Sequence, residues 1–391
     1  MHLCRLELVD VRSYAHVTVE LAPGVTVLVG ANGQGKTNLL EAIQRVAVGS
    51  SHRTAGDGPL VRSGSQRGVV RCELRTDQGR RRTVEIEIGG GRRNRLRVDG
   101  QDVYRSSDAI GVIRAVLFAP EDLAIVRGDP SERRRFLDDL LAQRRPAFAT
   151  ARSDYERALR QRNHLLRHAR GLSTTARASA ASTLEAWTEQ LVAHGTQIVA
   201  ARVAAVRTLA GPVDRFYREL ADRPEVVTME YRSSAGAVAS AEDGSPVPDP
   251  GPIAEGLRTA LTRVAADEFA RGVTLVGPHR DELDLAIGEL PARSHASQGE
   301  AWSLALALRL ATFEVLAEVE DRPIVLLDDV FAELDTTRRA GLAAACDRFD
   351  QVLVTAAVEA DVPLHGRKID VVLEAGTTQL HDRPMGSEGV A

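Results

Sequence analysis

The sequence predicts an α/β fold in which a nucleotide-binding lobe is interrupted by a second, mainly helical lobe. Three observations carry this prediction. Residues 30–37 fit the phosphate-binding loop pattern, residues 323–329 form an apolar run that ends in two carboxylates, and residues from about 126 to 271 are largely helical in period. Because the two nucleotide-binding motifs lie on either side of the helical segment, folding must bring them together across the insertion.

The phosphate-binding loop is predicted from eight consecutive residues, namely Gly30, Ala31, Asn32, Gly33, Gln34, Gly35, Lys36 and Thr37. A β-branched apolar run precedes the loop and helically spaced apolar residues follow it, so it connects a buried strand to a helix. There, backbone N–H groups converge on phosphate oxygens at the positive end of the helix. Lys36 is expected to reach the β and γ phosphates of ATP, and the Thr37 hydroxyl is expected to bind Mg²⁺.

The other elements of residues 1–125 are predicted to be strands joined by turns and loops. Residues 3–8 and 17–21 alternate around a turn and predict a hairpin, and residues 50–65 predict a loop. Strands are expected at 69–74, 83–88, 92–98 and 112–118. On the third of these, Arg93, Arg95 and Arg97 share one face. We favour their pairing with Glu85 and Glu87 on the neighbouring strand over contact with DNA.

The inserted lobe is expected at residues 126–271. Asp129 and Pro130 predict a helix start, and Pro146 ends that helix. The helical period continues to about residue 220 and predicts two longer helices that form a short antiparallel arm. A strand at 226–232, a flexible loop at 233–251 and a helix at 253–271 are expected after the arm. Residues 131–170 contain 11 Arg against 5 acidic residues, which indicates either a basic DNA-binding face or a solvated helix face. The candidate DNA contacts are Arg53, Arg62, Arg133 and Arg134.

The second half of the nucleotide-binding lobe is expected at residues 272–380. Strands are predicted at 273–276, 283–287, 323–327 and 352–355, and a helix at 301–319. Asp328 is assigned to Mg²⁺ and Asp329 to the attacking water, as in a Walker B motif. Upstream, Ser297 and Glu300 form a capping-box pattern around Gln298 and Gly299, and such a helix start can also bind an anion.

Composition excludes some classes of protein. No apolar run is long enough to span a bilayer, no secretory signal precedes the first strand pattern, and residues 381–391 are expected to be disordered. Cys4, Cys72 and Cys346 are far apart and lack metal-type spacing, so we expect reduced thiols in a cytoplasmic, nucleoid-associated protein.

These motifs together resemble the ABC-type head ATPases and, more closely, the RecF family of bacterial recombinational repair proteins. The resemblance covers nearly the whole chain, including residues 30–37, 51–54, 116–123, 131–138, 277–281 and 326–335. It implies an ABC-type ATPase head with a mixed sheet and a weak, DNA-stimulated ATPase activity. It also implies that Ser297, Gln298, Gly299 and Glu300 form a signature motif that contacts ATP held by the other subunit, with Asp335 in the D-loop.

The same resemblance implies an ATP-dependent homodimer on double-stranded, gapped or junction DNA, which works with RecR and RecO to help load RecA. The chain departs from the general ABC pattern at three places. Asp329 stands where Glu is usual, Ala356 and Ala357 stand where a γ-phosphate-sensing His is usual, and only Glu121 or Asp122 approximates the Q-loop residue. All three departures favour slow hydrolysis and a switch.

Three other classes of protein fit this sequence less well. In the ATPase subunit of a transporter the phosphate loop and the signature motif normally lie much closer in sequence. An SMC-type DNA tether requires a longer coiled coil than this arm provides. A small-molecule P-loop kinase does not need the motif at residues 297–300.

Overall fold

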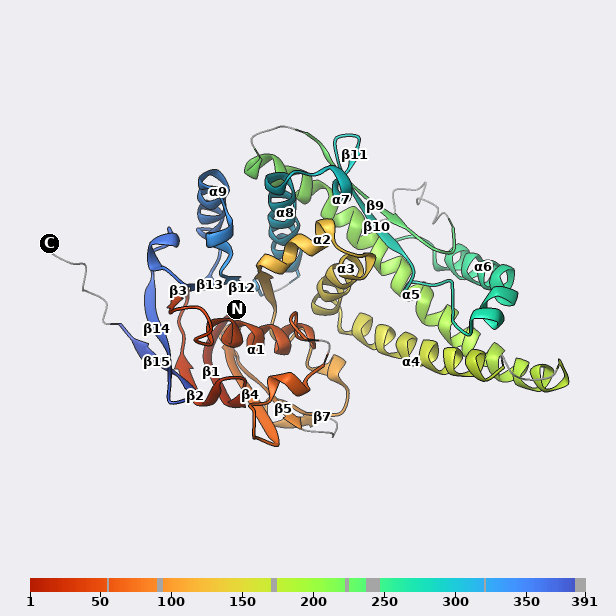
Figure 1. Ribbon diagram of the computed structural model, residues 1–391, viewed down its shortest axis with the longest axis horizontal. Coiled ribbons are helices and arrows are strands. Elements are labelled where there is room, and N and C mark those ends of the chain that lie inside the picture. Colours follow the sequence, from red (N-terminus) through yellow and green to blue (C-terminus); the bar gives the residue numbers. More distant parts are fainter. Residues whose placement is uncertain are drawn as a thin grey trace. The chain divides into compact units, whose positions relative to one another are not determined.

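The structure is a computed structural model that describes residues 1–54, 56–89, 94–169, 174–221, 225–236, 247–319 and 321–383, with only the backbone described at 174–181. The chain forms two compact units (Figure 1). The first comprises Met1–Leu123, Arg215–Pro224 and Gln298–Ala391, and the second comprises Ala124–Asp214 and Glu225–Ser297. Residues 272–297 were expected in the nucleotide-binding lobe but group with the second unit, because their strand β10 (Glu282–Ile287) pairs with β9 (Val227–Arg232) of the insertion.

A mixed six-stranded sheet positions the predicted nucleotide motifs in the first unit. Its strands, in spatial order, are β15 (Thr377–Asp382), β14 (Arg367–Glu374), β3 (Gly24–Val29), β13 (Gln351–Ala356), β12 (Ile324–Asp328) and β8 (Ala115–Phe118). Neighbours are parallel except for β14 and β15. Strands β8, β12 and β13 are buried throughout, as expected for parallel strands covered on both faces. The predicted strand before the phosphate loop and those at 323–327 and 352–355 are confirmed, whereas β8 begins three residues later than predicted.

A second six-stranded sheet is antiparallel and contains the N-terminal hairpin. Its strands, in spatial order, are β2 (Tyr14–Glu20), β1 (His2–Val11), β4 (Arg67–Arg75), β5 (Arg81–Gly89), β6 (Arg95–Val98) and β7 (Gln101–Val103). Buried and more exposed residues alternate along β4 and β5, so one face enters the core and the other faces solvent. The hairpin and the strands at 69–74 and 83–88 are confirmed.

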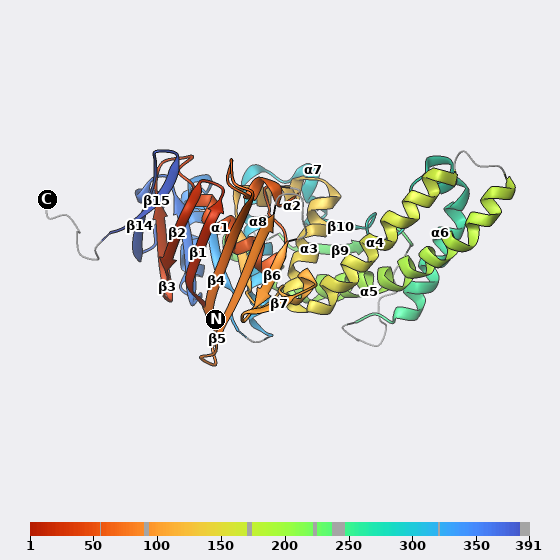
Figure 2. The same ribbon diagram turned by 90° about the horizontal axis from the view of Figure 1, so that it is seen from below.

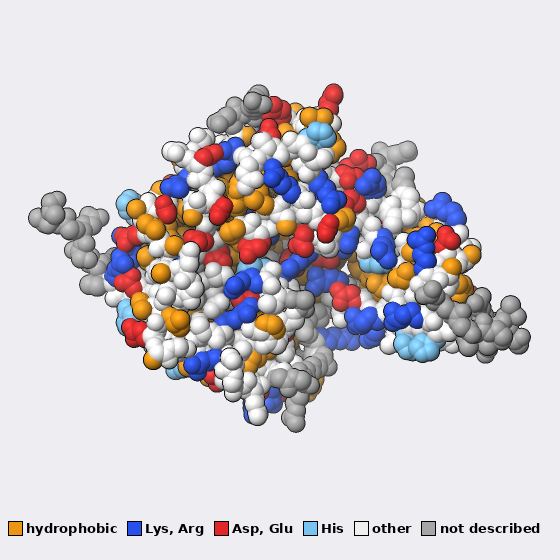
Figure 3. Space-filling view, in the orientation of Figure 1, with side chains coloured by type: hydrophobic (Ala, Val, Ile, Leu, Met, Phe, Trp, Pro, Cys, Tyr) orange, Lys and Arg blue, Asp and Glu red, His pale blue; other side chains and the backbone are white. Residues whose placement is uncertain are grey.

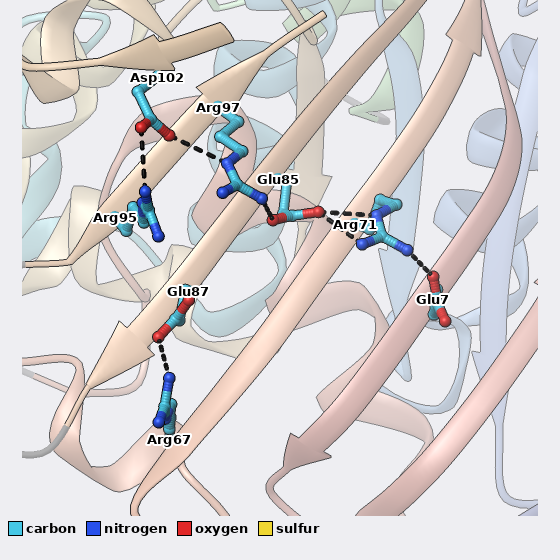
Figure 4. A network of polar contacts seen from close by, with 8 residues as sticks. All are labelled: Glu7, Arg67, Arg71, Glu85, Glu87, Arg95, Arg97 and Asp102. Carbon is cyan, nitrogen blue, oxygen red and sulfur yellow. Dashed lines mark hydrogen bonds and ion pairs between the residues drawn. The ribbon is translucent and has the colours of Figure 1, made fainter. Parts of the chain in front are cut away.

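The outer face of this sheet carries a ladder of ion pairs (Figure 4). Glu85 accepts hydrogen bonds from Arg71 at 2.6 Å and from Arg97 at 3.1 Å, and Arg71 also binds Glu7 at 2.5 Å. The predicted pairing of Arg97 with Glu85 is therefore confirmed. Arg95 lies opposite Glu87 in register but binds Asp102 at 3.1 Å, while Arg67 binds Glu87 at 3.0 Å. Arg93 lies outside the described residues.

Helix α1 (Lys36–Val48) lies between the two sheets of the first unit (Figures 1 and 2). It packs on β4 of the antiparallel sheet and on β8, β12 and β13 of the mixed sheet, so nearly all its residues are buried. Even the charged Glu41 is 0% exposed. Arg12 donates two hydrogen bonds to its carboxylate, at 2.7 and 3.0 Å. These pairs satisfy a charge that would otherwise be costly to bury.

The remaining elements of the first unit are short helices and the signature helix. Helix α8 (Gln298–Ala317) packs on β8 and confirms the predicted helix, although it begins three residues earlier. The other helical segments are α9 (Thr336–Cys346) and the 3-10 turns η1 (Gly58–Leu60), η2 (Ser106–Asp108), η3 (Pro120–Asp122), η4 (Val330–Glu333) and η5 (Glu359–Asp361).

The second unit is mainly helical and contains the predicted arm. Its helical segments are α2 (Leu123–Arg127), which begins at the border of the first unit, α3 (Pro130–Arg144), α4 (Pro146–Ala169), most of α5 (Thr174–Leu220), α6 (Pro250–Arg271) and α7 (Ala292–His295). Helices α4 and α5 run side by side in opposite directions (Figures 1 and 2), and the Arg162 side chain donates a 3.0 Å hydrogen bond to Thr188. The short sheet has the order β11 (Leu290–Pro291), β10, β9. The predicted helix boundaries at Pro130 and Pro146 are confirmed, as are the strands at 226–232 and 283–287.

The predicted strand at residues 273–276 is wrong. This segment is irregular, and side chains satisfy its backbone donors in place of a neighbouring strand. The N–H of Thr274 donates to Asn163 at 2.7 Å, and the N–H of Leu275 donates to Glu268 at 2.8 Å. The β-branched residues that suggested a strand therefore sit in a loop held by side-chain hydrogen bonds.

The following motif, residues 277–281, lies in a buried polar network of the second unit. Arg202 is 4% exposed and binds Asp138 through two hydrogen bonds, at 2.8 and 3.0 Å. It also donates to the carbonyl of Pro278 at 2.7 Å. The Tyr231 hydroxyl donates to Asp281 at 2.6 Å. Pro278 and Asp281 of this motif therefore accept hydrogen bonds inside the second unit.

No helix within the described part of the chain is long and apolar enough to cross a membrane. The three cysteines are free thiols, as predicted, and burial raises the pKa of Cys72 and of Cys346 to about 12.

Candidate nucleotide-binding site

The phosphate-binding loop joins β3 to α1, as the sequence predicts, and neighbouring strands hold it in shape. Gly35 has a φ of 105°, and a Cβ there would lie 2.6 Å from the Ser13 hydroxyl and 2.8 Å from the Thr378 hydroxyl. Only glycine combines this backbone conformation with so close an approach. The hydroxyl of Tyr14 donates to the carbonyl of Gly35 at 3.1 Å, and the carboxamide oxygen of Gln34 accepts from the N–H of Leu373.

Lys36 begins α1 and points back over the loop. Its ammonium group donates to the carbonyl oxygens of Gly30 at 2.6 Å and Ala31 at 3.1 Å. Burial lowers the pKa of Lys36, and the negative charges of Asp329 and Asp328 oppose that shift. An ammonium group beside a loop of backbone amides is suited to bind phosphate oxygens.

Thr37 meets the Walker B strand directly. Its hydroxyl donates to Asp328 at 2.9 Å, and the hydroxyl of Thr355 donates to the same carboxylate oxygen at 2.7 Å. Thr355 in turn accepts from the N–H of Asp329 at 2.9 Å. Burial raises the pKa of Asp328, whereas these two hydroxyl hydrogen bonds act in the opposite direction. The structure thus brings the two predicted halves of the site together.

Asp329 has a backbone conformation that is rare outside glycine. Its φ is 53°, at the point where β12 ends and η4 begins. Such a conformation costs about 1–3 kcal/mol and persists where surrounding structure imposes it, which is common at functional sites. Here the hydrogen bond from its own N–H to Thr355 helps to hold it.

Thr355 is the residue of this site that sequence analysis missed. It is the penultimate residue of β13, and it lies opposite Asp328 in the parallel pairing of β12 and β13. A polar residue at the carboxyl end of an otherwise apolar strand was the available signal, because parallel strands end at one edge of a sheet. Ala356 and Ala357 follow it, so the strand ends without the usual histidine.

The two candidates for a Q-loop equivalent have different surroundings. The Asp122 carboxylate caps η3 by accepting from the N–H of Ala119 at 3.1 Å, and it binds Arg309 at 2.6 Å. Both carboxylate oxygens of Asp122 therefore already have hydrogen-bond donors within the protein. Glu121 is more open to solvent, and its negative charge contributes to the raised pKa of Asp328. Of the two, Glu121 is available to the site.

The residues predicted to form the signature motif and the D-loop lie at the starts of two helices. Ser297 directly precedes α8, whose first residues are Gln298, Gly299 and Glu300, so the helix begins directly after the predicted capping-box serine and three residues before the predicted range. Asp335 caps α9, where its carboxylate accepts from the N–H of Arg338 at 2.9 Å. The guanidinium of Arg338 lies against Gly299, since a Cβ on that glycine would meet it at 2.7 Å.

The four arginines proposed for DNA contact differ in exposure. Arg133 is 3% exposed and binds Glu282 through two hydrogen bonds, at 2.8 and 2.9 Å, so its charge is used inside the second unit. Arg134 is half-buried and donates to the carbonyl of Asp281 at 2.8 Å. Burial lowers its pKa. Arg side chains gather with acidic ones over α3 and the start of α4 (Figure 3).

In the first unit, Arg53 and Arg62 are more open. Arg53 donates to Asn38, beside the phosphate loop, at 3.2 Å and lies 3.5 Å from Glu41. Arg62 lies 3.9 Å from Asp10 and lines a cavity of about 800 Å³ that Arg67 and Arg95 also line. Arg67 is paired with Glu87, which also lines this cavity, and Arg95 is paired with Asp102, so Arg62 has the longest acidic contact of the three.

Comparisons with known proteins identify relatives of the whole chain. Residues 2–378 match the family described as RecF/RecN/SMC N terminal domain. The chain is 48% identical to the DNA replication and repair protein RecF of Streptomyces avermitilis over 93% of its length and 95% of that protein. It is 47% identical to the same protein of Kineococcus radiotolerans, with 95% and 97% covered.

Solved structures agree on the fold. A structure titled as the recombination mediator protein RecF with ATPrS in the RecFOR pathway matches with a TM-score of 0.85 and 27% identity, over 97% of this chain and 98% of that chain. An SMC head bound to a winged helix domain of ScpA matches with a TM-score of 0.57 and 15% identity, covering 99% and 98%. The latter match shows that the chain has the fold of the ABC-type ATPase heads.

Proposed function

This chain is a member of the RecF family of DNA replication and repair proteins, and we propose that it is an ATP-controlled clamp on gapped or junction DNA. The observation that carries the proposal is the bond between Thr37 and Asp328, which joins the phosphate loop to the Walker B strand in one site. A match to a structure that is titled as containing ATP supports ATP as the nucleotide.

In this proposal ATP binds to the loop of residues 30–37. Backbone N–H groups at the start of α1 and the ammonium of Lys36 hold the phosphates, and Lys36 exchanges its carbonyl contacts for phosphate oxygens. Closure then places Ser297, Gln298 and Gly299 of a second copy against the nucleotide. Residues 31–33 at the tip of the P-loop and Ser297 and Gln298 at the start of α8 are exposed, which suits a site that two subunits complete.

The residues present fit Mg²⁺. The Thr37 hydroxyl and the Asp328 carboxylate are hard oxygen donors that already lie 2.9 Å apart. Mg²⁺ keeps several waters and uses one or two protein oxygens together with substrate phosphates, so a dense carboxylate cluster is not required. When bound, the ion neutralises charge on the phosphates. It also lowers the cost of keeping Asp328 ionised in a buried position.

Hydrolysis is proposed to be slow. Asp329 is the group placed to orient water, and its side chain is one methylene shorter than the usual Glu. Thr355 fixes the backbone of Asp329, but the chain has alanines at the two positions that follow. Where a Q-loop Gln would place a neutral amide, Glu121 places a negatively charged carboxylate that acts on Asp328. We therefore expect a DNA-stimulated switch with turnover below about 10 s⁻¹, the median for enzymes.

DNA contact is proposed through phosphates, with Arg62 and Arg53 of the first unit and Arg134 of the second as contributors. Such contacts are strongly salt-dependent and carry little sequence preference. Arg133 is not included, because its guanidinium is buried and paired with Glu282. RecR is the proposed protein partner, acting with RecO to help load RecA. The match to a structure titled with the RecFOR pathway supports this assignment.

The test is DNA retention by the Asp329→Asn protein, measured by fluorescence anisotropy with and without Mg·ATP on gapped and on continuous duplex. The proposal predicts ATP-dependent binding that favours the gapped duplex and that Lys36→Ala abolishes. Equal binding with and without ATP would remove the clamp and leave only an ATPase of the same fold.

A further inference from the structure

The contacts of Arg338 connect the start of α8 with Asp335, two predicted motifs that are far apart in the sequence. Arg338 lies on the first turn of α9, and its side chain is 13% exposed. Its Nε donates to the buried Ser303 hydroxyl of α8 at 2.8 Å, and its terminal nitrogen pairs with Asp335. One side chain therefore holds both the signature helix and the D-loop aspartate.

The position of Gly299 depends on the same side chain. A Cβ at this residue would lie 2.7, 2.9 and 3.0 Å from three atoms of the Arg338 guanidinium. The absence of a side chain at Gly299 thus lets the planar guanidinium lie flat on the first turn of α8. Arginine suits this position better than lysine, because its fork can bind Ser303 and Asp335 at once while its face covers the glycine.

Asp335 is also constrained from its own helix. One carboxylate oxygen accepts from the N–H of Arg338, and the other pairs with the guanidinium of the same residue. The D-loop aspartate, which is half-exposed, consequently has a fixed orientation relative to α8. Ser303 anchors the other end, since it is 0% exposed.

We propose that Arg338 is a positioning residue that fixes the start of α8 and Asp335 as one rigid surface for the nucleotide of the second copy. This rests on the proposed ATP-driven dimer. Arg338 acts through Gly299 and Asp335 and does not itself need to touch ATP. Because both motifs must meet the partner's nucleotide together, loosening their link weakens closure without affecting ATP binding to the protein's own P-loop.

The experiment compares Arg338→Ala, Arg338→Lys and Arg348→Ala. Arg348 is a matched control on the same unit, with an exposed side chain 3.8 Å from Glu219. Two quantities are measured with a slowly hydrolysed ATP analogue and Mg²⁺. These are the ATP affinity of the dilute monomer and the dimer dissociation constant from sedimentation. The expected result is that both Arg338 variants weaken the dimer by about tenfold or more, the scale of a lost charged hydrogen bond, while monomer ATP affinity and the Arg348→Ala dimer stay within about twofold.

A double-mutant cycle separates positioning from general destabilisation. If Arg338 acts by orienting the signature motif, Ser297→Ala weakens the wild-type dimer but has little further effect in Arg338→Ala. Multiplicative effects, or an Arg338→Ala dimer as tight as wild type, would overturn the inference and leave the proposed function intact. A wild-type protein that does not dimerise with ATP would instead overturn the proposed dimer, and this inference with it.

Discussion

The Thr37 hydroxyl donates a 2.9 Å hydrogen bond to Asp328, although the two residues are 291 positions apart in the sequence. Thr37 follows the strand β3, and Asp328 ends β12, with β13 between these two strands. The bond therefore reaches across one strand at the edge where all three parallel strands end. The predictions below follow from this geometry and from the ion pairs that support it.

Replacing Asp328 with Asn is expected to separate stability from function. The folded-state pKa of Asp328 is raised by burial, so its charged form destabilises the fold above the unfolded pKa. Asp328→Asn should leave the melting temperature of the nucleotide-free protein unchanged or raise it. It should also reduce the Mg²⁺-dependent part of ATP affinity by about tenfold or more. Calorimetric melting and titration of ATP with and without Mg²⁺ provide the check, and a large loss of stability would contradict this account.

Thr355 should matter through its hydroxyl alone. Thr355→Val keeps the shape but removes the donor to Asp328 and the acceptor for the N–H of Asp329. We expect a loss of about 1–3 kcal/mol in unfolding free energy, together with slower ATP hydrolysis. Thr355→Ser keeps the hydroxyl and serves as the control, measured by urea unfolding and phosphate release. Equal behaviour of the two variants would show that the hydroxyl has no role.

Arg133 is expected to be a stability residue. Its guanidinium is buried against Glu282, and removal of one partner of a buried pair costs about 3–5 kcal/mol. Arg133→Gln should therefore lower the unfolding midpoint of the second unit. Binding to DNA by the folded fraction should keep the wild-type dependence on salt. If Arg133→Gln changed the slope of log DNA affinity against log salt but kept normal stability, Arg133 would be a DNA contact.

Arg62 should show the opposite behaviour. Its side chain is 31% exposed, and its acidic neighbour Asp10 is 3.9 Å away, so little stability depends on it. Arg62→Gln is expected to reduce the slope of log affinity against log salt by about 1 and to change unfolding by less than about 0.5 kcal/mol. The slope is read from anisotropy titrations at several salt concentrations, and an unchanged slope would exclude a phosphate contact.

Acid should destabilise the second unit through His279. Burial lowers the pKa of His279 to about 4, and its neutral ring is held by the Tyr155 hydroxyl at 2.6 Å and by the carbonyl of Thr274 at 3.2 Å. The positive charges of Arg280, Arg134 and Arg162 also disfavour the protonated ring.

Because the unfolded state binds the proton more readily, this contribution is complete above pH 6.5 and is lost as the pH falls from about 6.5 to about 4. The full loss is about 3 kcal/mol. His279→Gln should flatten the unfolding free energy across this window, whereas the exposed His365→Gln should not. A profile that stays as steep in His279→Gln would assign the acid sensitivity to other groups.

Local sequence patterns were sufficient to predict elements whose structure depends on residues close together in the sequence. The loop at 30–37, the strand that ends in Asp328 and the helix that begins after Ser297 each carry a period or a cap within a few residues. The pairing of Arg97 with Glu85 was predictable because neighbouring antiparallel strands place such residues face to face.

Features set by tertiary contacts were not predictable. Residues 273–276 have the composition of a strand, but Asn163 and Glu268 bind their backbone in place of a sheet neighbour. Arg133 has the sequence surroundings of a surface arginine, yet Glu282, which is 149 positions away, buries it. Arg338 was missed for the same reason, since its partner Ser303 lies on another helix, whereas Thr355 had the signal of a polar residue near the end of an apolar strand.

The central claim is that ATP joins two copies of this chain, and the molar mass of the Asp329→Asn protein in solution tests it most directly. Light scattering with and without Mg·ATP, at a fixed protein concentration, gives that mass. The account predicts a monomer without nucleotide and a doubled mass with Mg·ATP, with Lys36→Ala remaining monomeric in both. A protein that binds ATP yet keeps the monomer mass, even with gapped DNA present, would contradict it.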